Sequence, residues 1–161
     1  MIYSKTVPSP VGDLTLASDG KSILGLWMEG QKHFAAGYPE LVQEELPVFA
    51  QAEHWLARYF RGDAPSPWSL PLSPKGSDFQ KRVWALLLEI PYGETTTYGA
   101  LAKKLSCKSA QAVGNAVGRN PISIIIPCHR VLGANGSLTG YAGGIQNKTF
   151  LLELEKRSSS L

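Results

Sequence analysis

Short apolar runs in the first third of the chain predict two strands. Residues 14–17 and 23–28 are such runs, and the turn-forming pair Asp19-Gly20 lies between them. From residue 44 to residue 61 apolar side chains recur every three or four positions, which predicts an amphipathic helix. The titratable residues of this part of the chain form no pattern that is typical of catalysis or of a metal site.

Residues 62–76 are rich in proline, serine and glycine, which is the composition of a connection between structural units. We therefore expect two domains: an N-terminal domain of strands plus a helix over residues 1–72, and a mostly helical C-terminal domain over residues 73–161. The predicted fold class is α/β, of the α+β kind in which strands and helices are separated along the chain.

The apolar pattern after the proline-rich segment has the period of a helix. A helix is expected over residues 79–90, because Pro91 disfavours its continuation. Thr97 and Ser109 are suited to cap two further short helices. These two helices are expected over residues 98–105 and 110–119. Their separation by a short break matches the spacing of a helix-turn-helix.

The second helix of that pair carries two glycines, Gly114 and Gly118, although each costs about 1 kcal/mol relative to alanine inside a helix. Together with Ala110 they lie on one face, which is therefore nearly bare backbone. Such a face suits either tight packing against another helix or close approach to nucleic acid. A helix about 10–12 Å across needs a thin face to enter a minor groove about 6 Å wide. Nearby lysines and Arg119 would then meet phosphates.

Charge is distributed unevenly along the chain. Residues 1–72 contain five Lys or Arg and eight Asp or Glu, whereas residues 73–161 contain eleven and five. This basic excess indicates a polyanionic partner, although an uneven surface without a partner explains it equally well. Hydrophobic residues make up 43% and charged residues 18%, as in globular proteins. No apolar stretch approaches the roughly 18–20 residues that cross a bilayer, so no membrane partner is expected.

The two cysteines and three histidines show no zinc-ligand spacing, so no metal is predicted. Two cysteines also form no disulfide framework, which favours the cytoplasm.

Cys128, however, directly precedes His129. It follows the β-branched run 122–126, which predicts a buried extended segment. This neighbour pair suggests a nucleophilic thiol. Because a free cysteine has a pKa near 8.5, the thiol needs a base, and His129 would reach it by a tight turn or through one water.

A histidine that acts as a base needs an acceptor that orients its ring. The helix expected over residues 145–157 offers two carboxylates. Glu153 has Arg157 one turn later, as in a surface ion pair. Glu155 lies on the apolar side, where a carboxylate is costly without a partner, and is therefore the better candidate. On spacing alone, a buried inert cysteine and a solvated glutamate remain the simpler interpretation.

The chain resembles the O6-alkylguanine–DNA alkyltransferase family (methylated-DNA–protein-cysteine methyltransferases) across its second half, over residues 77–155. Three segments carry the resemblance: Gly118-Arg119-Asn120-Pro121, Ile126-Pro127-Cys128-His129-Arg130-Val131 and Gly140-Tyr141-Ala142-Gly143-Gly144. The Pro-Cys-His-Arg core with both flanks is highly specific. The opening Ser-Pro-Val-Gly-Asp-Leu-Thr-Leu resembles the family's N-terminal domain far less specifically.

The resemblance implies a DNA repair protein that moves a methyl or larger alkyl group from guanine O6 irreversibly onto its own cysteine after base flipping, without a cofactor. Acceptance of O4-alkylthymine is left open. The implied catalytic residues are Cys128 as nucleophile, His129 as water-mediated base, Glu155 as the carboxylate that polarises it, and Asn120, which joins the recognition helix to the active-site segment. The implied substrate- and DNA-binding residues are Tyr98, Ala110, Gln111, Gly114, Arg119, Arg130, Val131, Tyr141, Ala142 and Gly143. The expected partner is double-stranded DNA that contains O6-alkylguanine, bound through its minor groove by a monomer.

Gln111 departs from the family pattern, which usually has an arginine that intercalates where the flipped base was. Glutamine carries no charge and cannot stack as a guanidinium does. Two alternatives stay open, and Gln111 is the reason for the first of them. One is an alkyltransferase-like protein that binds the lesion with little transfer. The other is a helix-turn-helix regulator whose Cys128 senses oxidants, with Cys107 as its resolving thiol.

Overall fold

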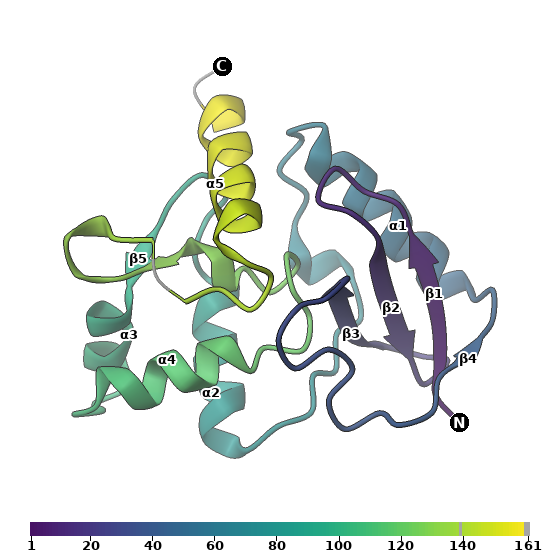
Figure 1. Ribbon diagram of the computed structural model, residues 1–161, viewed down its shortest axis with the longest axis horizontal. Helices are drawn as coiled ribbons and strands as arrows, with labels where there is room; N and C mark the ends of the chain where they lie inside the picture. Colours follow the sequence, from purple (N-terminus) through teal and green to yellow (C-terminus); the bar gives the residue numbers. More distant parts are fainter. Residues whose placement is uncertain (139, 160–161) are drawn as a thin grey trace.

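The computed structural model of the protein describes residues 1–138 and 140–159 (Figure 1). The first half of the chain forms a four-stranded sheet in the order β3-β2-β1-β4. Its strands are β1 (Tyr3–Val7), β2 (Leu14–Ser18), β3 (Ile23–Met28) and β4 (Val42–Gln43). Both predicted strands are confirmed, and β1 and β4 are additions that the apolar pattern did not reveal.

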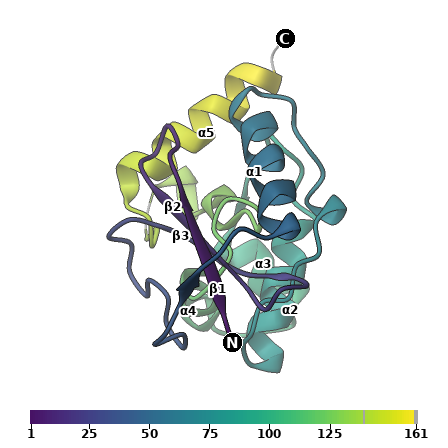
Figure 2. The same cartoon turned by 90° about the vertical axis from the view of Figure 1, so that its right-hand side faces the viewer.

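The predicted helix of the first half is confirmed as α1 (Pro47–Phe60), which covers one face of the sheet (Figures 1 and 2). It begins three positions later than expected, because Pro47 occupies the first turn, where its missing N–H costs nothing. The buried side chains recur at helical spacing: Val48, Phe49, Ala52, Trp55, Leu56 and Tyr59. This face packs on the sheet and carries Tyr59 toward the second half of the chain.

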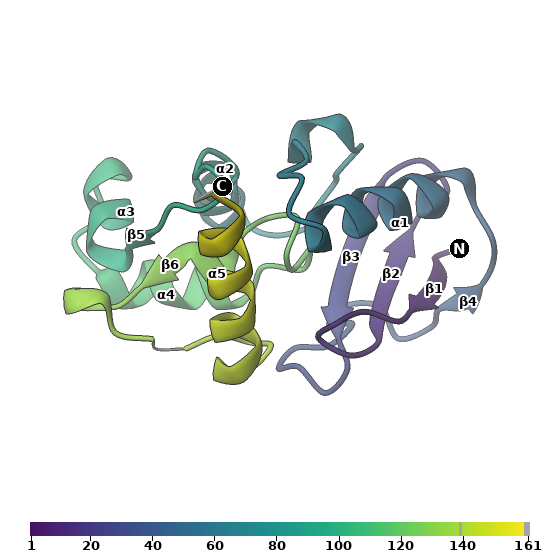
Figure 3. The ribbon, with the colours of Figure 1, turned by 90° about the horizontal axis from the view of Figure 1, so that it is seen from above.

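The second half is mostly helical, as predicted. Its helices are α2 (Asp78–Leu88), α3 (Tyr98–Lys104), α4 (Ala110–Gly118) and α5 (Ile145–Ser159). Thr97 and Ser109 cap α3 and α4 as expected, through hydrogen bonds to the backbone N–H groups of Ala100 and Ala112. A small parallel sheet of β5 (Thr96–Thr97) and β6 (Val131–Leu132) connects the start of α3 to the segment after Cys128. Figures 1 and 3 place α5 between α3 and α4 on one side and the large sheet on the other.

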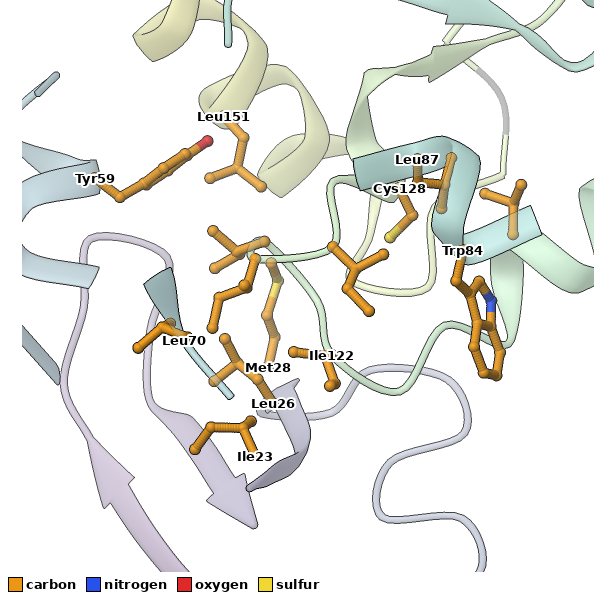
Figure 4. Packing of buried hydrophobic residues seen from close by; sticks show 14 of the residues in the cluster. Ile23, Leu26, Met28, Tyr59, Leu70, Trp84, Leu87, Ile122, Cys128 and Leu151 are labelled. Carbon is orange, nitrogen blue, oxygen red and sulfur yellow. The ribbon is translucent and has the colours of Figure 1, made fainter. Parts of the chain in front are cut away.

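The prediction of an extended segment over residues 122–126 is wrong. The backbone N–H of Ile126 donates to the carbonyl of Ile122 at 3.1 Å, so the run folds back on itself as a turn. Ile124 takes a positive φ of 70°, a rare conformation for a β-branched residue. The run is nonetheless buried, as expected, because its isoleucine side chains complete one apolar core with the sheet and the helices (Figure 4).

Backbone hydrogen bonds connect the edge of the large sheet to this turn. The N–H of Leu26 donates to the carbonyl of Pro121 at 2.8 Å, and the N–H of Ser123 donates back to Leu26 at 2.9 Å. Cys128 therefore follows a turn that both halves of the chain hold in place. Within the described ranges, no helix is both long and apolar enough to cross a membrane.

Candidate active site

The carboxylate of Glu155, on α5, is the centre of a buried network. Its Oε2 atom lies 2.5 Å from Nε2 of His129 and accepts a hydrogen bond from the hydroxyl of Tyr59 at 2.5 Å. Its Oε1 atom accepts from Nε of Arg130 at 2.7 Å and from the backbone N–H of Gly93 at 3.0 Å. His129 is completely buried and Glu155 is only 1% exposed. The structure thus brings together the histidine and the carboxylate that the sequence singled out.

The electrostatics of this network fix its protonation at neutral pH. Burial alone would raise the pKa of Glu155, but hydrogen bonds and charge from His129 and Arg130 outweigh it and lower this pKa to about 2. Burial lowers the pKa of His129 below its ordinary 6.5, against the opposing effect of Glu155. A neutral imidazole beside a carboxylate donates from Nε2, which leaves Nδ1 as an acceptor. Nδ1 is buried and has no hydrogen-bond partner in the described part of the chain. It is therefore available to accept a proton.

Asn120 holds the turn that carries the cysteine. Its side-chain amide donates to the carbonyl of Ile126 at 2.8 Å and to that of Ile122 at 3.3 Å. Its side-chain oxygen accepts from the backbone N–H of Ile122 at 3.0 Å. These hydrogen bonds satisfy backbone groups that would be paired with a neighbouring strand if the segment were extended. They also offset the energetic cost of the positive φ of Ile124. Asn120 thereby fixes the backbone that leads to Cys128, which is a positioning task.

The thiol of Cys128 lies in the 3-10 turn after Pro127 and is 4% exposed. Burial raises its pKa above 9.0, while a hydrogen bond from Asn120 and the positive charge of Lys148 act in the opposite direction. Lys148, on α5, is completely buried and donates to the carbonyl of Val131 at 2.6 Å. The raised pKa favours the protonated thiol, so a reaction through this sulfur would need a base.

The bare face of α4 lines an open groove. A Cβ atom at Gly118 would meet nothing within 4 Å, and one at Gly114 would lie 3.6 Å from the ring of Tyr98. The groove has a volume of about 520 Å³, and its lining includes Lys32, His33, Gly114, Asn115, Gly118, Arg119, Gly140, Tyr141 and Ala142. The packing interpretation of the glycine face is therefore wrong, because α4 packs through its other face, where Val113, Ala116 and Val117 are buried.

The expectation that Arg130 binds DNA is wrong. Its side chain is buried, and its guanidinium contacts both carboxylate oxygens of Glu155 and the carbonyl of Ile90. An arginine in a bidentate pair inside the core cannot reach a phosphate. Its place in the Pro-Cys-His-Arg motif is explained by the fixing of Glu155.

Comparison with known proteins agrees with this geometry. Residues 2–74 match the family model of the 6-O-methylguanine DNA methyltransferase ribonuclease-like domain, and residues 78–157 match the DNA binding domain of the same methyltransferase. A methylated-DNA–protein-cysteine methyltransferase of Haemophilus influenzae is 47% identical over 96% of this chain and 87% of the relative. The chain belongs to this family. A Methanosarcina acetivorans methyltransferase of the same name is 46% identical over 96% of this chain and 98% of its own length.

Solved structures show the same methyltransferase fold. A crystal structure of Mycobacterium tuberculosis OGT in complex with DNA superposes with a TM-score of 0.88 at 44% identity, over 97% of this chain and 94% of that one. The mixed α/β class and the resemblance seen in the sequence are thereby confirmed, and the chain is a member of a DNA repair alkyltransferase family.

The other predicted residues of this methyltransferase lie on α3, on α4 and in the chain between Cys128 and α5. Gln111 and Ala110 are exposed at the start of α4, and Arg119 is exposed at its end. The hydroxyl of Tyr98 donates to the carbonyl of Gly140 at 3.3 Å. The list is completed by Val131, which is buried, and by Tyr141, Ala142 and Gly143, which are partly exposed. A Cβ at Gly143 would lie 2.5 Å from Sδ of Met28, so a larger residue would fit there only if the side chain of Met28 shifted.

Two residues of the site escaped the sequence reasoning. Lys148 lies two helical turns before Glu155 on the same face, so the argument that selected Glu155 selects Lys148 as well. Tyr59 gave no signal, because its helical spacing predicts only a core position. Within the described ranges no group of three or more His, Cys, Asp or Glu side chains is placed to hold a metal ion.

Proposed function

We propose that this chain removes a methyl or larger alkyl group from O6 of guanine in double-stranded DNA and places it irreversibly on Sγ of Cys128. The observation that carries the proposal is a buried cysteine followed by a buried histidine. Nε2 of this histidine contacts the buried carboxylate of Glu155, and its Nδ1 has no hydrogen-bond partner among the described residues. The family membership and the exposed glycine face of α4 support it.

The proposed reaction needs no cofactor. The thiol proton passes to Nδ1 of His129 through one water, and Glu155 stabilises the imidazolium that forms. The sulfur then attacks the alkyl carbon, so that an S–C bond forms while the C–O6 bond breaks. The electron pair of the broken bond stays on the guanine, which takes up a proton as His129 returns to its neutral form. Burial raises the pKa of Tyr98, so its hydroxyl stays protonated and donates a hydrogen bond to the departing guanine. The thioether has no acidic leaving group, so each molecule acts once.

The groove on α4 supports DNA as the partner. A base inside a duplex cannot present its O6 substituent to a buried thiol, so it must be flipped out at a cost of a few kcal/mol. The thin face of Gly114 and Gly118 suits the minor groove, and Arg119 and Lys32 line the same space with positive charge. We expect a single copy of the protein, working in the cytoplasm, to bind in this way.

Mass spectrometry of the intact protein tests this proposal. After incubation with an O6-methylguanine duplex, the wild type is expected to gain the mass of one methyl group, saturating at one per molecule, and peptide mapping should place it on Cys128. A Cys107→Ser variant serves as the matched control and should gain the same group, because Cys107 lies at the break between α3 and α4. Lesion-selective binding without any gain in mass would contradict the proposal.

A second candidate function is damage recognition with little transfer, and the observation that favours it is the exposed Gln111 at the start of α4. When a base is flipped out, it leaves a gap in the stack of bases. Glutamine fills this gap less well than arginine does. We therefore expect Gln111→Arg to speed methyl transfer on duplex DNA by about 10-fold, a gain of about 1.4 kcal/mol, and to change transfer on single strands much less.

Single-turnover rates on both substrates check this prediction. Gln146→Arg is the matched control, because it adds the same charge at an exposed position of α5. If Gln146→Arg accelerates the duplex reaction as much, general charge attraction explains the gain. Equal duplex rates for the wild type and Gln111→Arg would show that glutamine serves flipping as well as arginine does.

A further inference from the structure

The ring of Tyr59 is held rigidly where the two halves of the chain meet. It stacks on Trp55 with centroids 5.6 Å apart and an interplanar angle of 11°. It meets Phe60, Tyr92 and His129 edge-on, at centroid distances of 5.2, 5.7 and 6.4 Å. The side chain is completely buried. Contacts on several sides leave the ring one position, so the location of its hydroxyl is fixed by the packing of α1.

The hydroxyl of Tyr59 reaches across to the carboxylate that orients His129. Figure 4 shows it directed from α1 toward α5. It donates to Oε2 of Glu155 at 2.5 Å and lies 3.4 Å from Nε2 of His129. Burial and the negative charge of Glu155 raise the pKa of Tyr59 far above 10.0, so the hydroxyl remains a donor throughout the range in which the protein works. Tyr59 and His129 therefore share one carboxylate oxygen.

We infer that Tyr59 is a positioning residue for the reaction, through which the N-terminal half of the chain sets the reactivity of Cys128. The inference rests on the roles proposed above for Cys128 and His129. The side chain of Arg130 fixes the carboxylate mainly through Oε1, with a longer contact of 3.1 Å to Oε2. Of the donors to Glu155 in the described part of the chain, Tyr59 alone comes from the first half. Its hydroxyl contacts Oε2, the same oxygen that lies 2.5 Å from Nε2 of His129.

Loss of this hydroxyl has a defined effect on the thiol. Without it, Oε2 keeps only the 3.1 Å contact from Arg130 besides its contact with His129. It is then held less firmly against Nε2, and the carboxylate stabilises the imidazolium less. Proton transfer from Cys128 to Nδ1 then becomes less favourable, and the thiol keeps its proton to a higher pH. A contact that served only the packing of the two halves would lower stability and leave this pH dependence where it was.

The test uses Tyr59→Phe, which keeps the ring and removes the hydroxyl. Carboxamidomethylation of Cys128 by iodoacetamide is followed by mass spectrometry across a range of pH, in a Cys107→Ser background so that one thiol reacts. We expect the variant to react about 10-fold more slowly at neutral pH, because it loses one hydrogen bond to a charged group. The midpoint of the pH dependence of its reaction rate should move to higher pH. Thermal unfolding of each variant shows that the folded protein is compared.

Tyr38→Phe is the matched control. It removes another hydroxyl of the first half that is buried and has no partner in the described residues, and its profile should equal that of the wild type. An unchanged midpoint in Tyr59→Phe overturns the inference, and so does a midpoint at lower pH, which would mean that the hydroxyl weakens the carboxylate. Because iodoacetamide needs no DNA, the inference can succeed while methyl transfer from DNA fails, and the reverse, so the two failures are distinguishable.

Discussion

Replacement of Glu155 by glutamine is expected to destabilise the protein by about 3–5 kcal/mol and to slow methyl transfer by about 100-fold or more. Glutamine has the same shape but no charge, so the buried guanidinium of Arg130 loses its counter-ion. The NH2 group of the glutamine would also face the N–H and O–H groups that donate to the carboxylate in the wild type, and two donors cannot form a hydrogen bond with each other. In addition, the imidazolium of His129 would lose the negative charge that stabilises it. Urea unfolding and single-turnover transfer measure the two effects separately.

Glu153→Gln is the matched control, because it makes the same change on the exposed side of α5. It should alter the free energy of unfolding and the transfer rate little.

The pH dependence of the stability provides an independent check. The folded pKa of Glu155 is about 2, below its ordinary value of 4.5, so its contribution to stability is present above the ordinary value and is lost as the pH falls toward 2. Glu155→Gln should therefore lose less stability than the wild type between these values. If the variant lost as much stability as the wild type over this pH range, other carboxylates would dominate acid unfolding.

The apolar pattern predicted most of the helical framework because each helix carries its own signal. Thr97 and Ser109 cap helices whose first residues follow from short-range chemistry alone, and the face that buries Glu155 follows from the helical period. The start of α1 was misplaced by three positions, since apolar periodicity does not register the preference of proline for a first turn.

The parts that escaped prediction depend on contacts between segments far apart in the sequence. The run 122–126 has the composition of a strand, but Asn120 and the edge of β3 supply the hydrogen bonds that turn it back on itself. The resemblance implied that Arg130 contacts DNA, and only the fold shows that its side chain faces Glu155. Tyr59 meets the same carboxylate from the other half of the chain, and local spacing does not encode that meeting.

The buried lysine of α5 completes the account of the thiol. Lys148 is completely buried, and burial lowers its pKa while the sulfur of Cys128 raises it. Its charge in turn lowers the pKa of Cys128, against the burial that raises it. The sequence predicts a thiol that needs activation. Our proposal assigns the base to His129, and the positive charge of Lys148 acts on the same thiol.

Lys148→Met keeps the length of the side chain and removes its charge, so it should raise the pKa of Cys128 further. At neutral pH we expect iodoacetamide to modify Cys128 about 10- to 100-fold more slowly, since the thiolate fraction falls tenfold for each unit of pKa. The difference should shrink at high pH, where the thiol is ionised in both proteins.

The change in stability should be modest by comparison. The carbonyl of Val131 loses its donor, which costs about 1–3 kcal/mol, but a buried ammonium is removed at the same time. Lys81→Met, at an exposed position of α2, is the matched control and should leave the profile unchanged. Parallel profiles for Lys148→Met and the wild type at every pH would mean that Lys148 acts on the site only by holding Val131. A gap that closes as the pH rises would instead assign the activation of the thiol to charge, because a purely geometric defect does not disappear when the thiol ionises.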